Sequence, residues 1–172
     1  MDNRDTPNWK GRPSLVLSHP NARGTGSTLW MTLVPATGDH CGFIRVRIAP
    51  QSKKQGYAWD SALESTLSET DLAKLLMVFT GWTERAANDG AGMDNAIRHT
   101  LDNGSVVTVD LSHKVDPYPS YCLSLVRRGP GMGTEQVQIE LSNAEALAIT
   151  EAIRGAMTYV AFGVPRLAKE EE

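Results

Sequence analysis

Two arginines stand two positions apart in the alternating run GFIRVRIA, at Arg45 and Arg47, and two lysines follow in the next polar turn, at Lys53 and Lys54. Residues two apart on a strand project from the same face, so both guanidinium groups can reach one ligand. Arginine also presents paired N–H donors that suit phosphate oxygens. The residue types and their spacing therefore predict a phosphate-binding surface.

Aromatic residues accompany these cations at Trp30, Tyr57 and Trp59. Aromatic rings stack on nucleobases, contributing roughly 1–3 kcal/mol per base without reading the base sequence. Arg98 and Arg127, on corresponding strands of the second half, are expected to extend the surface. The alternative interpretation is an ordinary solvated sheet face with a basic turn and tryptophans in the core.

Other kinds of chemistry have little support in the sequence. The histidines and cysteines lack C-x-x-C or H-E-x-x-H spacing, which argues against a metal site. Adjacent strand residues point to opposite faces, so Asp39-His40-Cys41 is a poor nucleophile–base pair. The glycines at 129–133 lead into a strand, whereas a dinucleotide loop opens a helix. We expect no enzyme activity, metal or cofactor, and we expect Cys41 and Cys122 to be small buried apolar residues.

The composition indicates a soluble single domain. The chain has 172 residues, of which 41% are hydrophobic and 22% charged. No apolar run approaches the ~20 residues of a membrane helix. The N-terminal residues are polar and acidic, without the apolar core of a secretion signal. These features predict a cytoplasmic protein that does not enter membranes.

The charge is unevenly distributed along the chain. Residues 1–54 carry eight basic and three acidic residues, a net charge of +5, while residues 55–172 carry nine basic and seventeen acidic, a net charge of −8. The overall net charge of −3 argues against a polyanion partner, because affinity for phosphates depends on the positive charge presented, whereas the basic first part is compatible with one. The acidic second part suits a basic protein partner.

Hydrophobic periodicity predicts four strands and a helix, twice over. Strands are expected at residues 14–19, 28–34, 42–49 and 57–66, followed by a helix that ends at about Arg85. After the linker come strands at 95–101, 105–111, 121–128 and 135–141, with Asn103-Gly104 as a hairpin turn and a loop from His113 to residue 120. A second helix follows, with an apolar stripe at Ile149, Ile153, Met157 and Val160.

The two predicted helices begin in the same way. Ser68 with Asp71 and Ser142 with Glu145 both match the capping-box pattern, and they align at an offset of 74. We therefore predict one α+β domain, residues 14–163, made of two tandem β4α halves at 14–87 and 93–163. Residues 1–13 are expected to form a flexible arm, and residues 164–172 an acidic tail.

This element order, with the caps Leu67-Ser68-x-x-Asp71 and Leu141-Ser142-x-x-Glu145, resembles the Whirly-like superfamily of single-strand nucleic-acid binders. The superfamily includes the plant Whirly proteins and the positive-cofactor-four transcriptional coactivators. The resemblance implies curved antiparallel sheets, two packed helices, and largely sequence-independent binding of single-stranded DNA or RNA without catalysis.

Strand edges that need cover also predict a homo-oligomer. The alternative function is a protein–protein assembly module that uses the same fold without nucleic acid.

Overall fold

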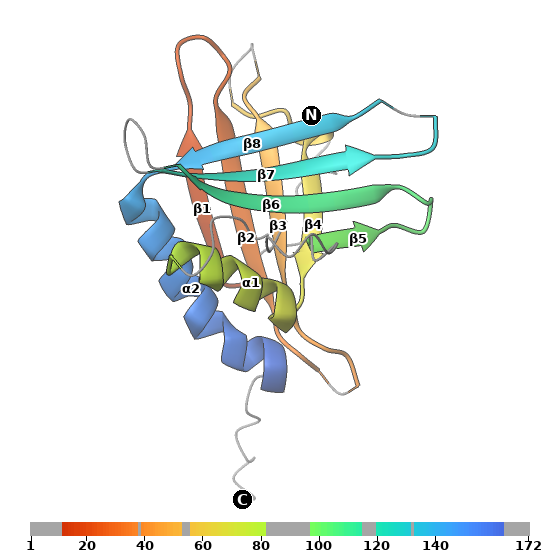
Figure 1. The fold of residues 1–172 in the computed structure, drawn as a ribbon, viewed down its shortest axis with the longest axis vertical. Helices are drawn as coiled ribbons and strands as arrows, with labels where there is room; N and C mark the ends of the chain where they lie inside the picture. The colour runs from red at the N-terminus through yellow and green to blue at the C-terminus, as the bar shows by residue number, and fades with distance from the viewer. Residues whose placement is uncertain are drawn as a thin grey trace, which may run out of the picture.

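The computed structural model describes residues 12–37, 39–52, 56–81, 97–114, 120–131 and 133–163. Strands and helices in these ranges follow the predicted order of two β4α units (Figure 1). The first half contains β1 (Ser14–His19), β2 (Ser27–Val34), β3 (Phe43–Pro50), β4 (Leu63–Leu67) and α1 (Glu69–Phe79). The second half contains β5 (Ile97–Thr100), β6 (Val106–Lys114), β7 (Ser120–Arg128), β8 (Glu135–Leu141) and α2 (Asn143–Phe162). The predicted α+β fold is confirmed.

Several element boundaries differ from the predicted ones. The fourth strand begins at Leu63, because Trp59–Ser61 forms a 3₁₀ turn where the sequence predicted a strand. Helix α1 ends at Phe79 and not near Arg85, since Gly81 takes a left-handed backbone with φ +78°. Strand β6 continues to Lys114, so His113 and Lys114 belong to this strand and not to the predicted loop. The predicted arm up to residue 11, the tail from residue 164, and Lys53 and Lys54 lie outside the described residues.

Each half forms its own antiparallel sheet, with the strands in chain order. The first sheet is β1-β2-β3-β4 and the second is β5-β6-β7-β8. The two sheets cross each other in Figure 1 and pack face to face, with β2, β3 and β4 against strands β6 to β8. Their inner faces are apolar, and fully buried side chains fill the space between them, among them Leu29, Ile48, Val109, Leu125 and Ile139.

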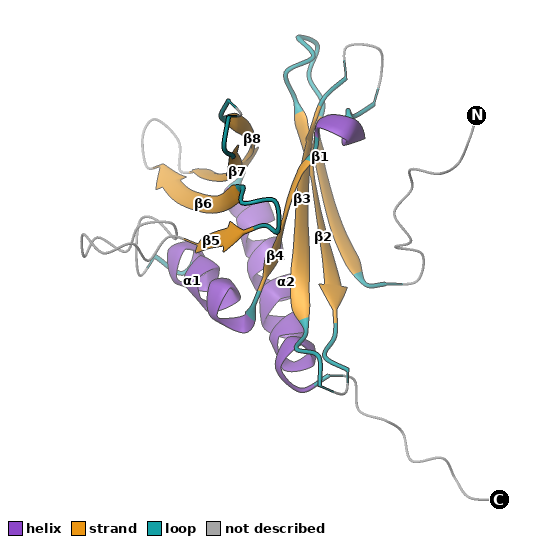
Figure 2. Ribbon diagram, turned by 90° about the vertical axis from the view of Figure 1, so that its right-hand side faces the viewer, coloured by secondary structure: helices purple, strands orange, loops and turns teal. Residues whose placement is uncertain are grey.

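The two helices lie side by side (Figure 2) and both have the predicted capping box. The hydroxyl oxygens of Ser68 and Ser142 accept hydrogen bonds from the backbone N–H groups of Asp71 and Glu145. In return, each carboxylate accepts one from the backbone N–H of its serine, at 3.0 Å and 2.9 Å. Two N–H groups without a helical partner are thereby satisfied at each helix start.

The C-terminal end of α2 is held by the segment between β2 and β3. The N–H of Ala36 donates to the carbonyl of Tyr159 at 3.0 Å, and the N–H of Gly42 donates to that of Val160 at 3.1 Å. These bonds connect the first sheet directly to the helix of the second half. Within the described residues, neither helix is long and apolar enough to cross a membrane.

Candidate nucleic-acid interface

The face of the first sheet that points away from the second sheet carries three of the predicted residues. Arg45 and Arg47 alternate along β3 with the buried side chains of the core, so both lie on this outer face. Arg47 is directly opposite Trp30 on β2 and Glu64 on β4. Residues directly opposite in an antiparallel sheet share a face, so these four side chains form one group.

Arg47 is fixed in place by several contacts. Its Nη2 donates a hydrogen bond to the carbonyl oxygen of Trp59 at 2.9 Å. Its guanidinium carbon lies 5.1 Å from the centroid of the Trp59 ring, within the range of a cation–π contact. The Glu64 carboxylate lies 4.0 Å from its Nε. The 3₁₀ turn before β4 therefore places Trp59 over the outer face.

Two tryptophans form a preformed aromatic platform beside this arginine. The rings of Trp30 and Trp59 meet edge to face, with centroids 5.6 Å apart and an interplanar angle of 69°. This is a favourable arrangement for aromatic pairs. Both residues are half-buried, so part of each remains accessible. Tyr57, two residues before Trp59, is also half-buried and forms an isolated β-bridge with Gln51.

Phe43 is a further aromatic residue of this face that the sequence analysis did not include among the site residues. It precedes Arg45 by two positions on β3, and the Arg45 guanidinium carbon lies 5.9 Å from the centroid of its ring. The signal was present in the alternation of the strand, because Phe43 falls in phase with Arg45 and Arg47. Of the predicted residues, Lys53 and Lys54 lie outside the described part of the chain.

The second sheet does not extend this surface. Arg98 is exposed on the outer face of the second sheet, paired with Thr108. Arg127 has the opposite orientation, since its partner Val107 belongs to the buried side of β6. Arg127 also forms an ion pair with Glu135 of β8. The two arginines therefore occupy different faces of their sheet.

The repeat itself explains this result. Counting along the strand registers from the two helix caps, the positions of Arg45 and Arg47 correspond to Cys122 and Ser124 in the second half. Ser124 has Asp110 opposite it, where the first sheet has Trp30 opposite Arg47. The corresponding strand positions of the second half therefore do not repeat the cation–aromatic group.

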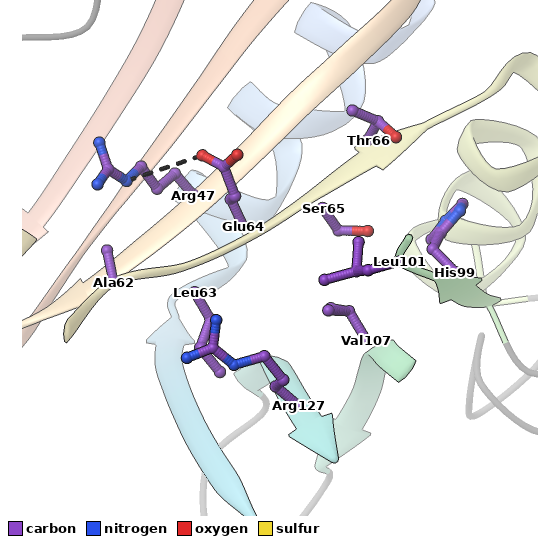
Figure 3. A pocket seen from close by; sticks show the side chains of 10 residues that line it. All are labelled: Arg47, Ala62, Leu63, Glu64, Ser65, Thr66, His99, Leu101, Val107 and Arg127. Atoms are coloured by element: carbon purple, nitrogen blue, oxygen red, sulfur yellow. Dashed lines mark ion pairs between the residues drawn. The ribbon is translucent and has the colours of Figure 1, made fainter. Parts of the chain in front are cut away.

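A groove runs along β4, between this edge strand and the second sheet (Figure 3). Its volume is about 440 Å³, and Arg47 and Arg127 both line it. Leu63, Leu101 and Val107 contribute apolar surface, and Figure 3 shows the latter two close to Ser65. We refer to this cavity as the β4 groove. Arg127 of the second sheet and Arg47 of the outer face thus line the same groove, although they come from opposite sides of β4.

Among the residues that the structure describes, no group of three or more histidine, cysteine, aspartate or glutamate side chains is placed to hold a metal ion. Cys41 is exposed before the start of β3, which corrects the prediction that it is buried. Cys122 is buried near the start of β7, as predicted, and burial raises the pKa of its thiol. A raised pKa disfavours the nucleophilic thiolate.

Comparison with known proteins supports the architecture. No protein-family model matches the sequence, and no curated protein matches it significantly. Solved structures match along most of their length. WHY1 from Arabidopsis thaliana superimposes with a TM-score of 0.65 at 16% identity, covering 86% of both chains. The chain has the Whirly fold.

Two further structures with the Whirly fold give the same result. WHY3 from Arabidopsis thaliana matches with a TM-score of 0.64 at 15% identity, covering 86% of this chain and 89% of WHY3. The plant transcriptional regulator PBF-2 matches with a TM-score of 0.62 at 15% identity, and the match covers 90% of this chain and 84% of PBF-2. At such low identity the likeness concerns the Whirly fold alone, and function has to be argued from the residues of this chain.

Proposed function

We propose that this protein binds single-stranded nucleic acid through the outer face of its first sheet, without catalysis. The observation that carries the proposal is the group formed by Arg47, Trp59 and Trp30. It joins a fixed guanidinium to two aromatic rings on one sheet face. The resemblance to the Whirly-like superfamily supports the same function.

Each part of the group has a role in this proposal. Arg45 and Arg47 contact phosphates of the backbone, and Trp30 and Trp59 stack on bases. Stacking needs an accessible base face, which a duplex hides within its own stack. The binding is therefore selective for single strands, tolerant of base sequence, and weakened by salt because phosphate contacts release counterions.

The test is fluorescence anisotropy with a labelled oligonucleotide of about 30 nucleotides, its duplex and the matching RNA, at two salt concentrations. We expect the wild-type protein to prefer the single strand. A double variant with Arg45→Glu and Arg47→Glu should lose most of the affinity. The matched control, Arg98→Glu with Arg128→Glu, changes the net charge equally on the second sheet and should bind nearly as wild type.

Two outcomes would contradict the proposal. Equal losses in both double variants would mean that overall charge determines binding, and not the outer face of the first sheet. No single-strand binding by wild type at low salt would refute nucleic-acid binding itself. Protein partners of the acidic second half would then be the next class to test.

We also propose that the protein is a homo-oligomer. Three large apolar side chains of α2 are solvent-accessible, with exposed fractions of 61% for Leu147, 40% for Tyr159 and 86% for Phe162. Apolar side chains that project from one helix are suited to contact another protein chain. Light scattering after size exclusion should give a mass above that of one chain, and Phe162→Glu should lower it.

A further inference from the structure

The β4 groove has a counterpart elsewhere in the molecule. A smaller cavity of about 260 Å³ lies against β8 and the β1–β2 hairpin, lined in part by His19, Ser27 and Gln138. In the registers of the two sheets, His19 corresponds to His99. Gln138 likewise corresponds to Glu64. Each groove thus lies between the last strand of one half and the first hairpin of the other.

The two grooves differ in their chemistry. At the positions that correspond to Arg47 and Arg127, the registers place Ser124 and Pro50. The β5–β6 hairpin contributes the apolar side chains of Leu101 and Val107 to the β4 groove. The β1–β2 hairpin contributes Asn21 and Ser27 to the smaller groove. Of these two grooves, only the β4 groove combines apolar side chains with two arginines.

Ser65 adds an unexplained polar group to the β4 groove. Its side chain is on the inner face of β4, between the buried Leu63 and Leu67, and the residue is only 6% exposed. The hydroxyl has no hydrogen-bond partner among the described residues. The corresponding position in β8 holds the apolar Ile139. A buried hydroxyl without a partner is unfavourable, so this position suits a ligand with a hydrogen-bonding edge.

We propose that the β4 groove receives an unstacked nucleobase of the bound single strand, and this inference rests on the proposed function. The base lies between Leu101 and Val107 and hydrogen-bonds to the Ser65 hydroxyl. Its flanking phosphates lie near Arg47 and Arg127. Proteins hold extruded bases with apolar contacts to the ring, hydrogen bonds to its edge and cations near its phosphates, and the lining of the β4 groove includes all three kinds of group.

The position of Arg47 connects this groove to the outer face. Its side chain lines the β4 groove and also holds Trp59 over the outer face. A strand bound to the tryptophan platform can therefore continue across the edge strand β4 into the groove. A duplex cannot follow this path, because its bases are paired.

The first experiment fills the groove at an exposed position. Leu101 is 40% exposed, so Leu101→Trp should fold while it occupies the space. The matched control is Gln138→Trp, an exposed position lining the counterpart groove. With an oligo-dT strand, we expect Leu101→Trp to weaken binding about tenfold, the order expected for one stacked base. Gln138→Trp should bind as wild type.

The second experiment tests the arginine without changing the net charge. The double variant Arg127→Gln with Glu135→Gln removes the ion pair as a whole. We expect it to weaken binding several-fold and to lower the slope of log affinity against log salt, as the loss of one phosphate contact should. Arg128→Gln removes a neighbouring charge that points to the opposite face, and it should have little effect.

A third measurement needs no variant. Wild-type protein irradiated with an oligonucleotide containing 4-thiothymidine should crosslink within the peptide that carries Leu101 and Val107.

These outcomes separate the groove from the outer face. If the Arg45 and Arg47 variants weaken binding but the groove variants do not, and no crosslink maps to the groove, the inference is wrong and the proposed function stands. If wild type binds no single strand, both are refuted.

Discussion

The Nε2 atom of His19 lies 2.5 Å from a carboxylate oxygen of Glu145, and this contact joins the first strand of one half to the helix cap of the other. The second half repeats the relationship in reverse. His99 on β5 lies 3.6 Å from the carboxylate of Asp71, at the start of α1. Since His19 corresponds to His99 and Asp71 to Glu145, the two contacts are related by the internal repeat.

These reciprocal contacts explain why the two halves form one unit. Each capping carboxylate serves the start of its own helix and a histidine of the opposite half. Burial raises the pKa of Glu145, but the hydrogen bonds from the backbone and hydroxyl of Ser142 and the contact with His19 outweigh it. The net result is a pKa below the ordinary glutamate value.

Glu145→Gln should destabilise the fold in a pH-dependent way. A pKa lowered by folding stabilises the native state above the unfolded-state value, roughly 4.3, and this contribution disappears as the pH falls through the lower native value. We expect a loss of about 1 kcal/mol at pH 7, typical of a helix cap, that shrinks as the pH falls from 5 to 3. Urea unfolding across this range measures it, and the exposed control Glu151→Gln should change little. A loss independent of pH would show that the carboxylate charge is not responsible.

The two histidine contacts should differ in strength. His19→Ala removes the 2.5 Å contact and should lower the free energy of unfolding by about 1–2 kcal/mol. His99→Ala removes the longer contact and should have the smaller effect. Denaturant unfolding of both variants at pH 7 gives the comparison, and the opposite ranking would contradict the geometry.

Gly42→Ala should weaken the attachment of α2 to the first sheet. A Cβ at this position would lie 2.6 Å from the backbone nitrogen of Ala36 and 2.7 Å from backbone atoms of Val160. Because backbone atoms cannot move aside cheaply, we expect a loss of about 1–3 kcal/mol. The control is Gly155→Ala in α2, where nothing lies within 4 Å of the added carbon. That variant should be neutral or more stable, by up to about 1 kcal/mol. Thermal unfolding of the two proteins distinguishes these results.

Trp59→Ala should weaken single-strand binding about tenfold, because it removes one of the two rings of the aromatic platform. Its backbone carbonyl, which accepts the hydrogen bond from Arg47, remains in any variant. The two variants therefore differ only in the side chain. Trp59→Phe keeps an aromatic ring that can stack on a base, so it should recover part of the affinity. Anisotropy titrations at fixed salt measure both. If alanine and phenylalanine variants both bind as wild type, the platform does not contact bases.

Local patterns were enough to predict the elements of the fold. The alternation around Arg45 and Arg47 placed a strand and its two faces correctly, and the serines at 68 and 142 marked both helix starts. These features depend on residues close together in the chain, where side-chain period and capping chemistry determine the backbone. The repeat of four strands and a helix followed from the same local signals.

The site depended on relationships that the sequence does not display. That Arg98 and Arg127 lie on different faces is decided by the register of strands β5, β6 and β7, which depends on the loops between them. Trp59 reaches Arg47 because the chain makes a 3₁₀ turn there and not a strand.

The sequence by itself determined the order of the strands and helices, the apolar and polar sides of β3, and where the basic and aromatic residues occur. The tertiary structure alone decided the β4 groove, the burial of the Ser65 hydroxyl and the contact of His19 with Glu145. Each of these joins residues far apart in the chain. Their proximity arises from the packing of two sheets and two helices, because burial of apolar faces determines which distant polar groups meet.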